Sequence, residues 1–167
     1  EWRDMFYSFN TNPEVVSLRG CTSLMERVQR AKAAPWGGST NLLATFRMIL
    51  QQGRDSGYTA KRMPSRLVII SDMQFNAACG PFTNLEVARE LYREAGYDFP
   101  EIVFWNVRGD VSRSNGFPAT STEKGVAMIS GFSKSMIDIL LDNGPIPTAY
   151  DLMVKTLMNE RYDLMTL

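Results

Sequence analysis

Apolar residues along this chain follow two different spacings. Residues 66–70, 101–107 and 125–129 are short apolar runs with β-branched or aromatic side chains, which is typical of β-strands. The first run is expected to be buried on both faces, as in a parallel sheet. Residues 41–52 carry apolar positions at helical spacing, and the capping-box pattern that opens residues 83–96 predicts a second helix. Strands that alternate with helices predict an α/β fold with a doubly wound, mostly parallel sheet flanked by helices.

Turn and capping residues predict the other elements. The turn residues 10–13 separate two apolar runs, which indicates a hairpin. Ser23 is followed three residues later by Glu26, and this capping box predicts a helix that runs to Lys32. The remaining segments are predicted as strands over 5–9 and 15–18, loops over 53–64 and 108–122, and helices over 133–141 and 148–158.

The composition fits a single domain over residues 1–167. The apolar content of 44% and the charged content of 22% are ordinary for a globular protein. The chain does not begin with Met, so we expect an N-terminally truncated domain. No apolar stretch approaches the ~18 residues that a membrane span needs, so no membrane partner is expected. The two cysteines are not spaced as a metal or redox pair, which favours an intracellular, cytoplasmic location.

Charge and histidine content exclude several functions. The 18 basic residues balance the 18 acidic ones, so a chain-wide attraction for nucleic acid is missing. The chain contains no histidine, which excludes Ser-His-Asp and Cys-His catalysis and zinc sites of the HExxH type. The groups that remain for catalysis or ligand binding are carboxylates, hydroxyls and a hard metal ion. We therefore favour a non-catalytic role over an enzyme.

A carboxylate and a hydroxyl are predicted at one edge of the sheet. Asp72 comes just after an apolar strand, so it must be paired, capped or bound to a metal ion, because desolvating it alone costs on the order of several kcal/mol. Thr40 lies at the start of a helix and is expected to reach the same crevice, beyond the carboxyl ends of the strands. Both are hard oxygen ligands, which predicts a Mg²⁺ or Mn²⁺ site.

Other polar residues are expected at the rim of this site or just behind it: Ser39, Gln74, Asn106, Ser130 and Ser133. Each position also has a structural interpretation. Ser39, Thr40 or Asn41 would cap a helix, Ser133 would do the same, and Asn106 would hold a loop by hydrogen bonds. Gly37 and Gly38 offer a further alternative, a phosphate held on backbone N–H groups, although the P-loop lysine is absent.

The order of five segments resembles the von Willebrand factor A-like domain. These segments are Phe6–Phe9, Gly37–Asn41, Ile69–Phe75, Pro100–Asn106 and Gly125–Ser133. The chain is most similar to the C-terminal domain of an uncharacterised family of eukaryotic and large-virus proteins, itself similar to the A-like domain of the Ro RNA-binding autoantigen. The resemblance implies a metal-ion-dependent adhesion site built from three loops, in which Thr40 matches the second loop and Asp72 the third.

The first loop of such a site, with the pattern Asp-x-Ser-x-Ser, is absent from this chain. In the family that motif follows the first, central strand of the sheet. The resemblance therefore implies a sheet that lacks this strand, with a gap between the strand at Phe6 and the strand at Leu67. The metal site implied by Thr40 and Asp72 is incomplete, because hard cations bind about six oxygen ligands.

These observations lead to one favoured function and two alternatives. The favoured function is a non-catalytic protein-interaction module, in which Mg²⁺ or Mn²⁺ on Thr40 and Asp72 accepts a carboxylate from a protein partner. One alternative is a metal-dependent phosphoester hydrolase that uses Asp72, the loop of Gly37 and Gly38, and Arg108. The other is a part in an RNA-binding particle, which rests on analogy with the Ro-like proteins.

Overall fold

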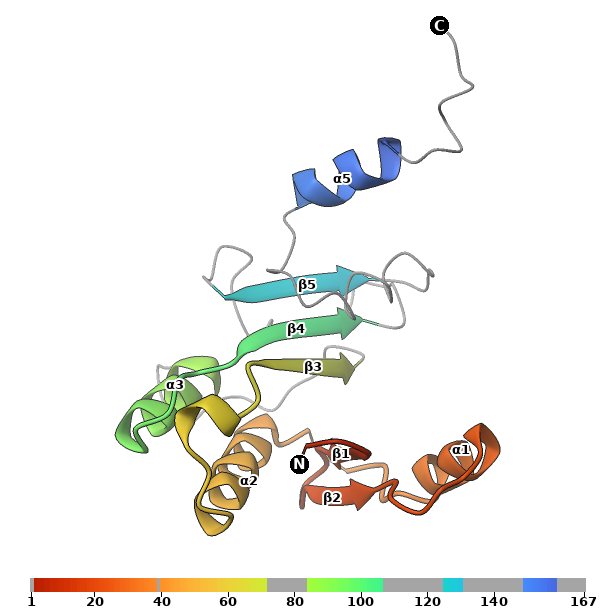
Figure 1. The fold of residues 1–167 in the computed structure, drawn as a ribbon, viewed down its shortest axis with the longest axis vertical. Coiled ribbons are helices and arrows are strands. Elements are labelled where there is room, and N and C mark those ends of the chain that lie inside the picture. The colour runs from red at the N-terminus through yellow and green to blue at the C-terminus, as the bar shows by residue number, and fades with distance from the viewer. Residues whose placement is uncertain (1, 39, 72–83, 107–124, 131–148, 159–167) are drawn as a thin grey trace, which may run out of the picture.

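The described strands of the protein form two separate sheets. The computed structural model describes residues 2–38, 40–71, 84–106, 125–130 and 149–158 (Figure 1). An antiparallel pair is formed by β1 (Met5–Ser8) and β2 (Glu14–Ser17), and a parallel sheet is formed, in this order, by β3 (Arg66–Ser71), β4 (Glu101–Asn106) and β5 (Val126–Ser130). The mixed α/β class and the predicted hairpin are thereby confirmed.

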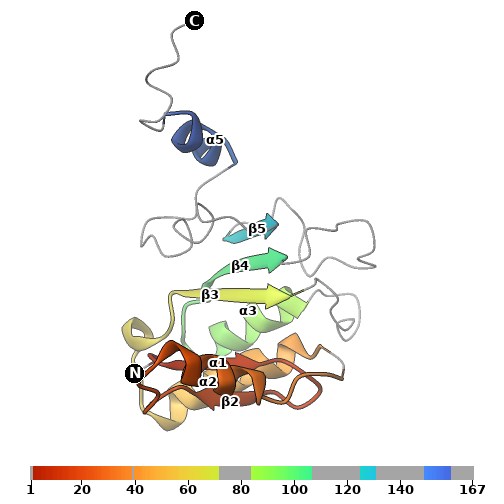
Figure 2. The ribbon, with the colours of Figure 1, turned by 90° about the vertical axis from the view of Figure 1, so that its right-hand side faces the viewer.

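Two helices pack on one face of the parallel sheet. They are α2 (Leu42–Asp55) and α3 (Asn84–Glu94), and they lie on the same side of β3 and β4 (Figure 2). Alternate strand residues face them, because successive side chains of a strand point to opposite faces. The buried core that results joins side chains of all four elements, among them Phe46, Ile49, Ile69, Leu85, Tyr92, Ile102 and Phe104.

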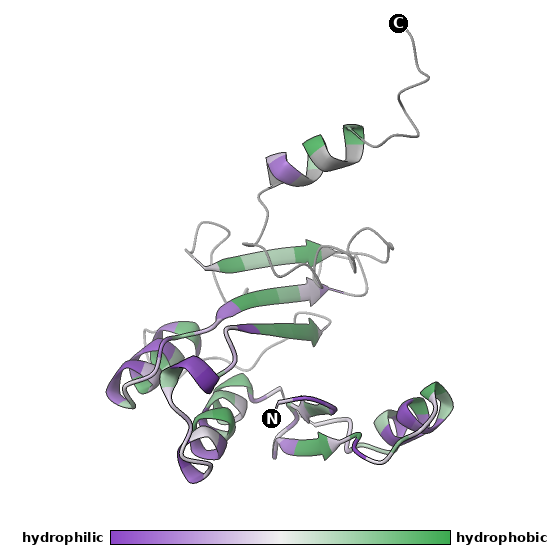
Figure 3. Ribbon diagram, viewed as in Figure 1, coloured by the Kyte–Doolittle hydropathy of each residue, from purple (hydrophilic) through white to green (hydrophobic). Residues whose placement is uncertain are grey.

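The other face of the sheet is buried unevenly. On β4, Val103 is 2% exposed and Trp105 is 9% exposed, whereas on β3 Val68 is 42% exposed and Ile70 is 53% exposed. The expectation that β3 is buried on both faces is therefore wrong, although its residues are as hydrophobic as those of β4 (Figure 3). Among the described strands β3 is the edge strand of the parallel sheet, so its side chains are flanked on one side only, whereas those of β4 lie between β3 and β5.

Helix α1 (Leu24–Lys32) begins as its capping box predicts. The Glu26 N–H donates to Ser23 Oγ at 3.2 Å, and a Glu26 carboxylate oxygen accepts from the Thr22 N–H at 2.7 Å. None of the residues of α1 is buried. An ion pair of 2.7 Å between Arg27 and Asp4 attaches the helix to the start of the hairpin.

The bounds of the described elements lie within two residues of the predicted ones, except around Gly53. Helix α2 continues through Gly53 to Asp55, so the expected loop over 53–64 begins later and contains the short helix η1 (Ala60–Arg62). Gly53 lies inside the helix and does not end it, and an added Cβ at this position would meet the flexible end of the Met63 side chain. Helix α5 (Ala149–Leu157) confirms the last predicted helix, whereas the expected loop over 108–122 and the expected helix over 133–141 lie outside the described residues.

Three aromatic rings form the centre of the core. The Tyr92 ring lies edge-to-face against Phe46 and Phe99, with centroid distances of 6.3 and 5.3 Å. Tyr92 is fully buried, and burial raises the pKa of its hydroxyl. Within the described part of the chain this hydroxyl has no hydrogen-bond partner. A buried polar group without a partner costs free energy, so Tyr92 carries a local destabilisation.

We predict that Tyr92→Phe stabilises the protein. The substitution keeps the ring contacts and removes the unpartnered hydroxyl, so the free energy of unfolding should rise by about 1 kcal/mol. Urea unfolding followed by circular dichroism measures this change. Phe46→Ala serves as the reference for a lost ring and should lower the free energy of unfolding by roughly 3–5 kcal/mol. A clear loss of stability in Tyr92→Phe would contradict the prediction.

Candidate functional site

A cavity of about 350 Å³ lies at the carboxyl end of β3. Its walls come from the end of β1, the loop before α2 and the last residues of β3. The lining residues are Phe9, Asn10, Trp36, Gly37, Gly38, Thr40, Ile70 and Ser71. Thr40 therefore shares a cavity with Ser71, the residue that directly precedes Asp72.

Thr40 is placed there by the way α2 begins. The first helical residue is Leu42, and the side-chain oxygen of Asn41 accepts a hydrogen bond from the Ala44 N–H at 3.1 Å. Asn41 is thus the N-cap, which confirms that one of residues 39–41 caps the helix, and Thr40 precedes the capping position. Thr40 is half-buried and lines the cavity.

The two glycines beside Thr40 have a structural role. Gly37 and Gly38 have φ angles of 122° and 79°, which lie in the left-handed region that favours glycine. A Cβ on Gly38 would also lie 2.6 Å from Thr11 Oγ1, so the loop packs closely against the turn of the hairpin. Close packing therefore accounts for Gly38 without a bound phosphate. No Lys or Arg is among the described lining residues to help hold one.

Hydrogen bonds and stacking fix the loop over the hairpin. Asn10 Nδ2 donates to the Pro35 carbonyl at 2.6 Å, and the Trp36 indole N–H donates to the Ala31 carbonyl at 2.7 Å. The Trp36 ring stacks on Phe6 with a centroid distance of 5.9 Å and an interplanar angle of 2°. Trp36 is nevertheless 59% exposed, so it presents an aromatic surface beside the cavity.

The carboxyl ends of the three parallel strands lie in register. Ser71 pairs with Asn106, and Asn106 pairs with Ser130. Ser71 and Asn106 are both buried. Asn106 is not among the residues that line the cavity, so it lies behind the site, one strand away from Ser71.

Some of the predicted site residues lie together at the carboxyl edge of the parallel sheet. The structure brings Thr40 to the end of β3, and it places Asn106 and the backbone of Ser130 at the same edge of the sheet. The predicted residues outside the described part of the chain are Ser39, Asp72, Gln74 and Ser133, together with Arg108. For Ser130 only the strand position is described.

Phe9, Asn10 and Ser71 are among the lining residues that sequence reasoning missed. Phe9 directly follows β1, Asn10 lies in the turn after it, and Ser71 is the last residue of β3. Ser71 carried a signal, because a polar residue that closes an apolar strand stands at the sheet edge where ligands bind. Phe9 and Asn10 carried none, since their position depends on the long-range contact between hairpin and loop.

The described walls offer neutral oxygen atoms and no charged side chain. Within the described residues, no group of three or more His, Cys, Asp or Glu side chains is placed to hold a metal ion. A hard cation binds about six oxygen ligands, several of them negatively charged. The Thr40 hydroxyl fits such a site as one ligand, and Asp72 would have to supply the first carboxylate.

Comparison with known proteins identifies the family. Residues 1–163 match the family described as domain of unknown function (DUF7788). The chain belongs to this family. It is also similar to the uncharacterized protein L728 of Acanthamoeba polyphaga mimivirus, with 35% identity over 137 residues, which is 81% of this chain and 23% of that protein. The chain thus spans about a quarter of the length of this relative. No solved structure matches the chain.

The comparisons leave two sequence predictions as they were. They do not bear on the von Willebrand factor A-like resemblance or on metal binding, and both stay predictions. Separately, none of the described helices has the length and apolar character that crossing a membrane demands.

We predict that Gly38→Ala destabilises the protein more than Gly20→Ala. The two glycines have similar φ angles of 79° and 82°, so a side chain costs about 1–2 kcal/mol of backbone strain at each. Only Gly38 has a close neighbour, because an added Cβ at Gly20 meets nothing within 4 Å. Thermal unfolding of both variants measures the difference, and equal losses would show that the contact with Thr11 is easily relieved.

Proposed function

We propose that this domain is a non-catalytic protein-interaction module. A divalent cation, Mg²⁺ or Mn²⁺, is held at the cavity by Thr40 and Asp72 and binds a carboxylate of a protein partner. The observation that carries the proposal is that Thr40 and Ser71 line the same cavity, and Ser71 directly precedes Asp72 in the sequence. The von Willebrand factor A-like resemblance supports the same pair of ligands.

The charge of the cavity supports a role for a metal ion. A partner carboxylate needs a positive charge, and no Lys or Arg is among the described lining residues. The chain has no histidine to provide one. A cation held by oxygen ligands would supply the charge, and the partner carboxylate would complete its coordination.

The surroundings of the cavity suit a protein ligand. Trp36 is exposed beside the cavity and is held in place by its stack on Phe6. Rigid aromatic residues at the surface contribute strongly to protein–protein binding, because they bury a large area at a low cost in conformational entropy. A partner that inserts a carboxylate would therefore cover Trp36 at the same time.

Neither alternative is favoured by a described contact. A phosphoester hydrolase needs a basic side chain in the cavity, and the described walls contain none. Nucleic-acid binding needs available basic residues, but Arg27 pairs with Asp4 and Arg30 donates to the Ser17 carbonyl. The equal numbers of basic and acidic residues also predict low affinity for RNA.

We predict that Mn²⁺ binds the protein and that Asp72→Ala abolishes this binding. Paramagnetic broadening of the Thr40 and Ser71 amide signals by Mn²⁺ reports binding at the cavity. Thr40→Ala should weaken binding about tenfold, because it removes one neutral oxygen ligand worth about 1–2 kcal/mol. Asp72→Ala removes the only expected charged ligand and should eliminate the broadening.

Two matched variants control for changes elsewhere. Asp98→Ala removes an exposed carboxylate, and Thr59→Ala removes a hydroxyl that makes no capping hydrogen bond, so both should bind Mn²⁺ like the unmodified protein. Acetate added with Mg²⁺ should shift the same amide signals, and acetate alone should not. Mn²⁺ broadening that persists in Asp72→Ala would remove the metal-mediated function.

A further inference from the structure

Helix α1 is attached to the protein by its polar side. Arg27 forms the ion pair with Asp4, which directly precedes β1, and Arg30 donates to the carbonyl of Ser17, the last residue of β2, at 3.2 Å. Arg27 and Arg30 are three positions apart, so they lie on the same side of the helix. The side of α1 that faces the hairpin is therefore polar.

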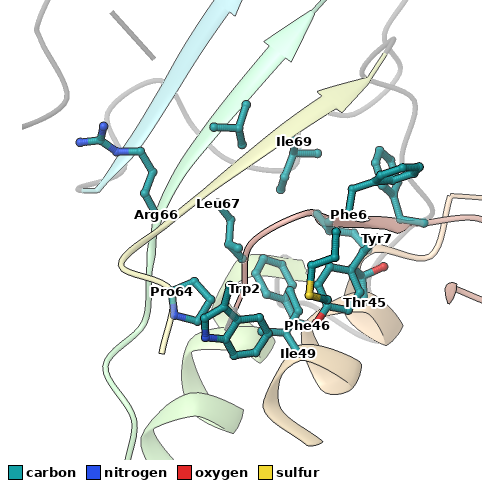
Figure 4. Close-up of a pocket in the computed structure, with 14 residues that line it drawn as sticks. Trp2, Phe6, Tyr7, Thr45, Phe46, Ile49, Pro64, Arg66, Leu67 and Ile69 are labelled. Carbon is teal, nitrogen blue, oxygen red and sulfur yellow. The ribbon is translucent and has the colours of Figure 1, made fainter. Parts of the chain in front are cut away.

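The hairpin that carries α1 is itself held against the core. Strands β1 and β3 are the side walls of a mostly apolar groove of about 270 Å³, and helix α2 is its floor (Figure 4). Phe6 and Tyr7 of β1 line this groove together with Phe46 and Ile49 of α2. The Tyr7 hydroxyl donates to Gln52 Oε1 of α2 at 2.5 Å. The hairpin thus fixes the position of α1, although no residue of α1 is buried.

The side of α1 that faces away from the hairpin is apolar. Leu24, Met25 and Val28 are 76%, 65% and 39% exposed. Successive residues of an α-helix are about 100° apart, which puts Met25 and Val28 opposite to Arg27 and Arg30. Leu24 lies one turn before Val28, on the same stripe. A cluster of large apolar side chains at the surface is typical of an interaction site.

The surroundings of this apolar face are positively charged. Glu26 is the single acidic residue between positions 15 and 38, whereas the basic residues of this segment are Arg19, Arg27, Arg30 and Lys32. The Glu26 carboxylate is already used in the capping box, where it accepts from the Thr22 N–H. Lys32 is exposed one turn after Val28, and it forms no ion pair within the described residues.

We propose that the outward face of α1 binds an acidic amphipathic helix of a partner protein. Apolar side chains of that helix pack against Leu24, Met25 and Val28, and a carboxylate beside them pairs with Lys32. The contact is roughly two turns long, because α1 has 9 residues. The partner helix therefore carries apolar residues at helical spacing with Asp or Glu next to them. The inference concerns α1 and does not depend on the proposed metal site.

The combination of apolar and basic groups favours a protein helix over other occupants. RNA offers phosphates but no aliphatic side chains to cover Leu24, Met25 and Val28. An anionic membrane attracts each basic residue by only about 1 kcal/mol, and Arg27 and Arg30 face the hairpin instead. A second copy of α1 would bring two positively charged faces together, which costs free energy.

The test uses a synthetic acidic peptide as the partner helix. The peptide is about 14 residues long and consists of Leu, Ala and Glu, with Leu at helical spacing. The control peptide has Lys in place of every Glu. In an NMR titration of the ¹⁵N-labelled chain, the acidic peptide should shift the amide signals of α1, and the control peptide should bind about tenfold more weakly. Added salt should weaken binding of the acidic peptide, because it screens exposed charges.

Two matched pairs of variants locate the binding surface. Leu24→Ala should weaken binding of the acidic peptide about tenfold, because it removes a large apolar side chain from the contact. Leu157→Ala removes an exposed leucine from α5 and should leave binding unchanged. Lys32→Glu should remove the preference for the acidic peptide, whereas Lys61→Glu, at an exposed lysine of η1, should keep it.

All four substitutions change exposed side chains, so the fold should persist. Unchanged amide signals of β3, β4 and β5 check this in every sample. Leu24 is the first residue of α1, so its replacement could also affect the start of the helix. Met25→Ala therefore repeats the test at a second apolar position and should weaken binding by a similar factor.

Several outcomes would overturn the inference. Equal binding of the acidic and the basic peptide would show that charge is not recognised, and equal losses in Leu24→Ala and Leu157→Ala would show that any exposed leucine suffices. Methyl signals of Leu24 and Val28 that a soluble gadolinium chelate leaves unchanged would mean that this face is already covered. Shifts of the α1 amides that grow with protein concentration would identify a second copy as the occupant. Stronger binding to phosphatidylserine vesicles than to the peptide would identify a membrane.

Discussion

The in-register parallel ladder of β3, β4 and β5 is the constraint on which the rest of the structure depends. Hydrogen bonds between parallel strands fix which residues lie side by side, so Ser71, Asn106 and Ser130 end at the same edge of the sheet. Packing of α2 against β3 then brings the loop before α2 to that edge. The cavity with Thr40 follows from these two facts, and neither depends on a bound ligand.

Local signals in the sequence predicted most of the described elements. The strands and the start of α1 depend on short-range patterns, such as β-branched runs and the Ser23–Glu26 capping box, which act within a few residues. The errors arose where distant contacts decide. Gly53 resembles a helix end but accommodates Met63 within α2, and the exposure of Val68 depends on which strands lie beside β3.

The same distinction applies to the candidate site. The sequence placed Thr40 near the end of β3 correctly, because the topology of parallel sheets gathers such residues at one edge. It did not decide between Thr40 and Asn41 as the cap of α2, since that choice depends on where the first helical turn begins. It also gave no sign that Phe9 and Asn10 complete the cavity, because hairpin and loop meet only in the folded chain.

The groove and the cavity are neighbouring features of one strand edge. Ile69 lines the groove and Ile70 lines the cavity, while Phe9 lines both, so a continuous surface follows β3 to its carboxyl end. The groove offers apolar side chains, whereas the cavity offers neutral oxygens. Interactions of both kinds act at short range, and the zero formal net charge adds no long-range attraction. Under the proposed function, recognition at this edge would depend on the fit of the bound groups rather than on the overall charge of a partner.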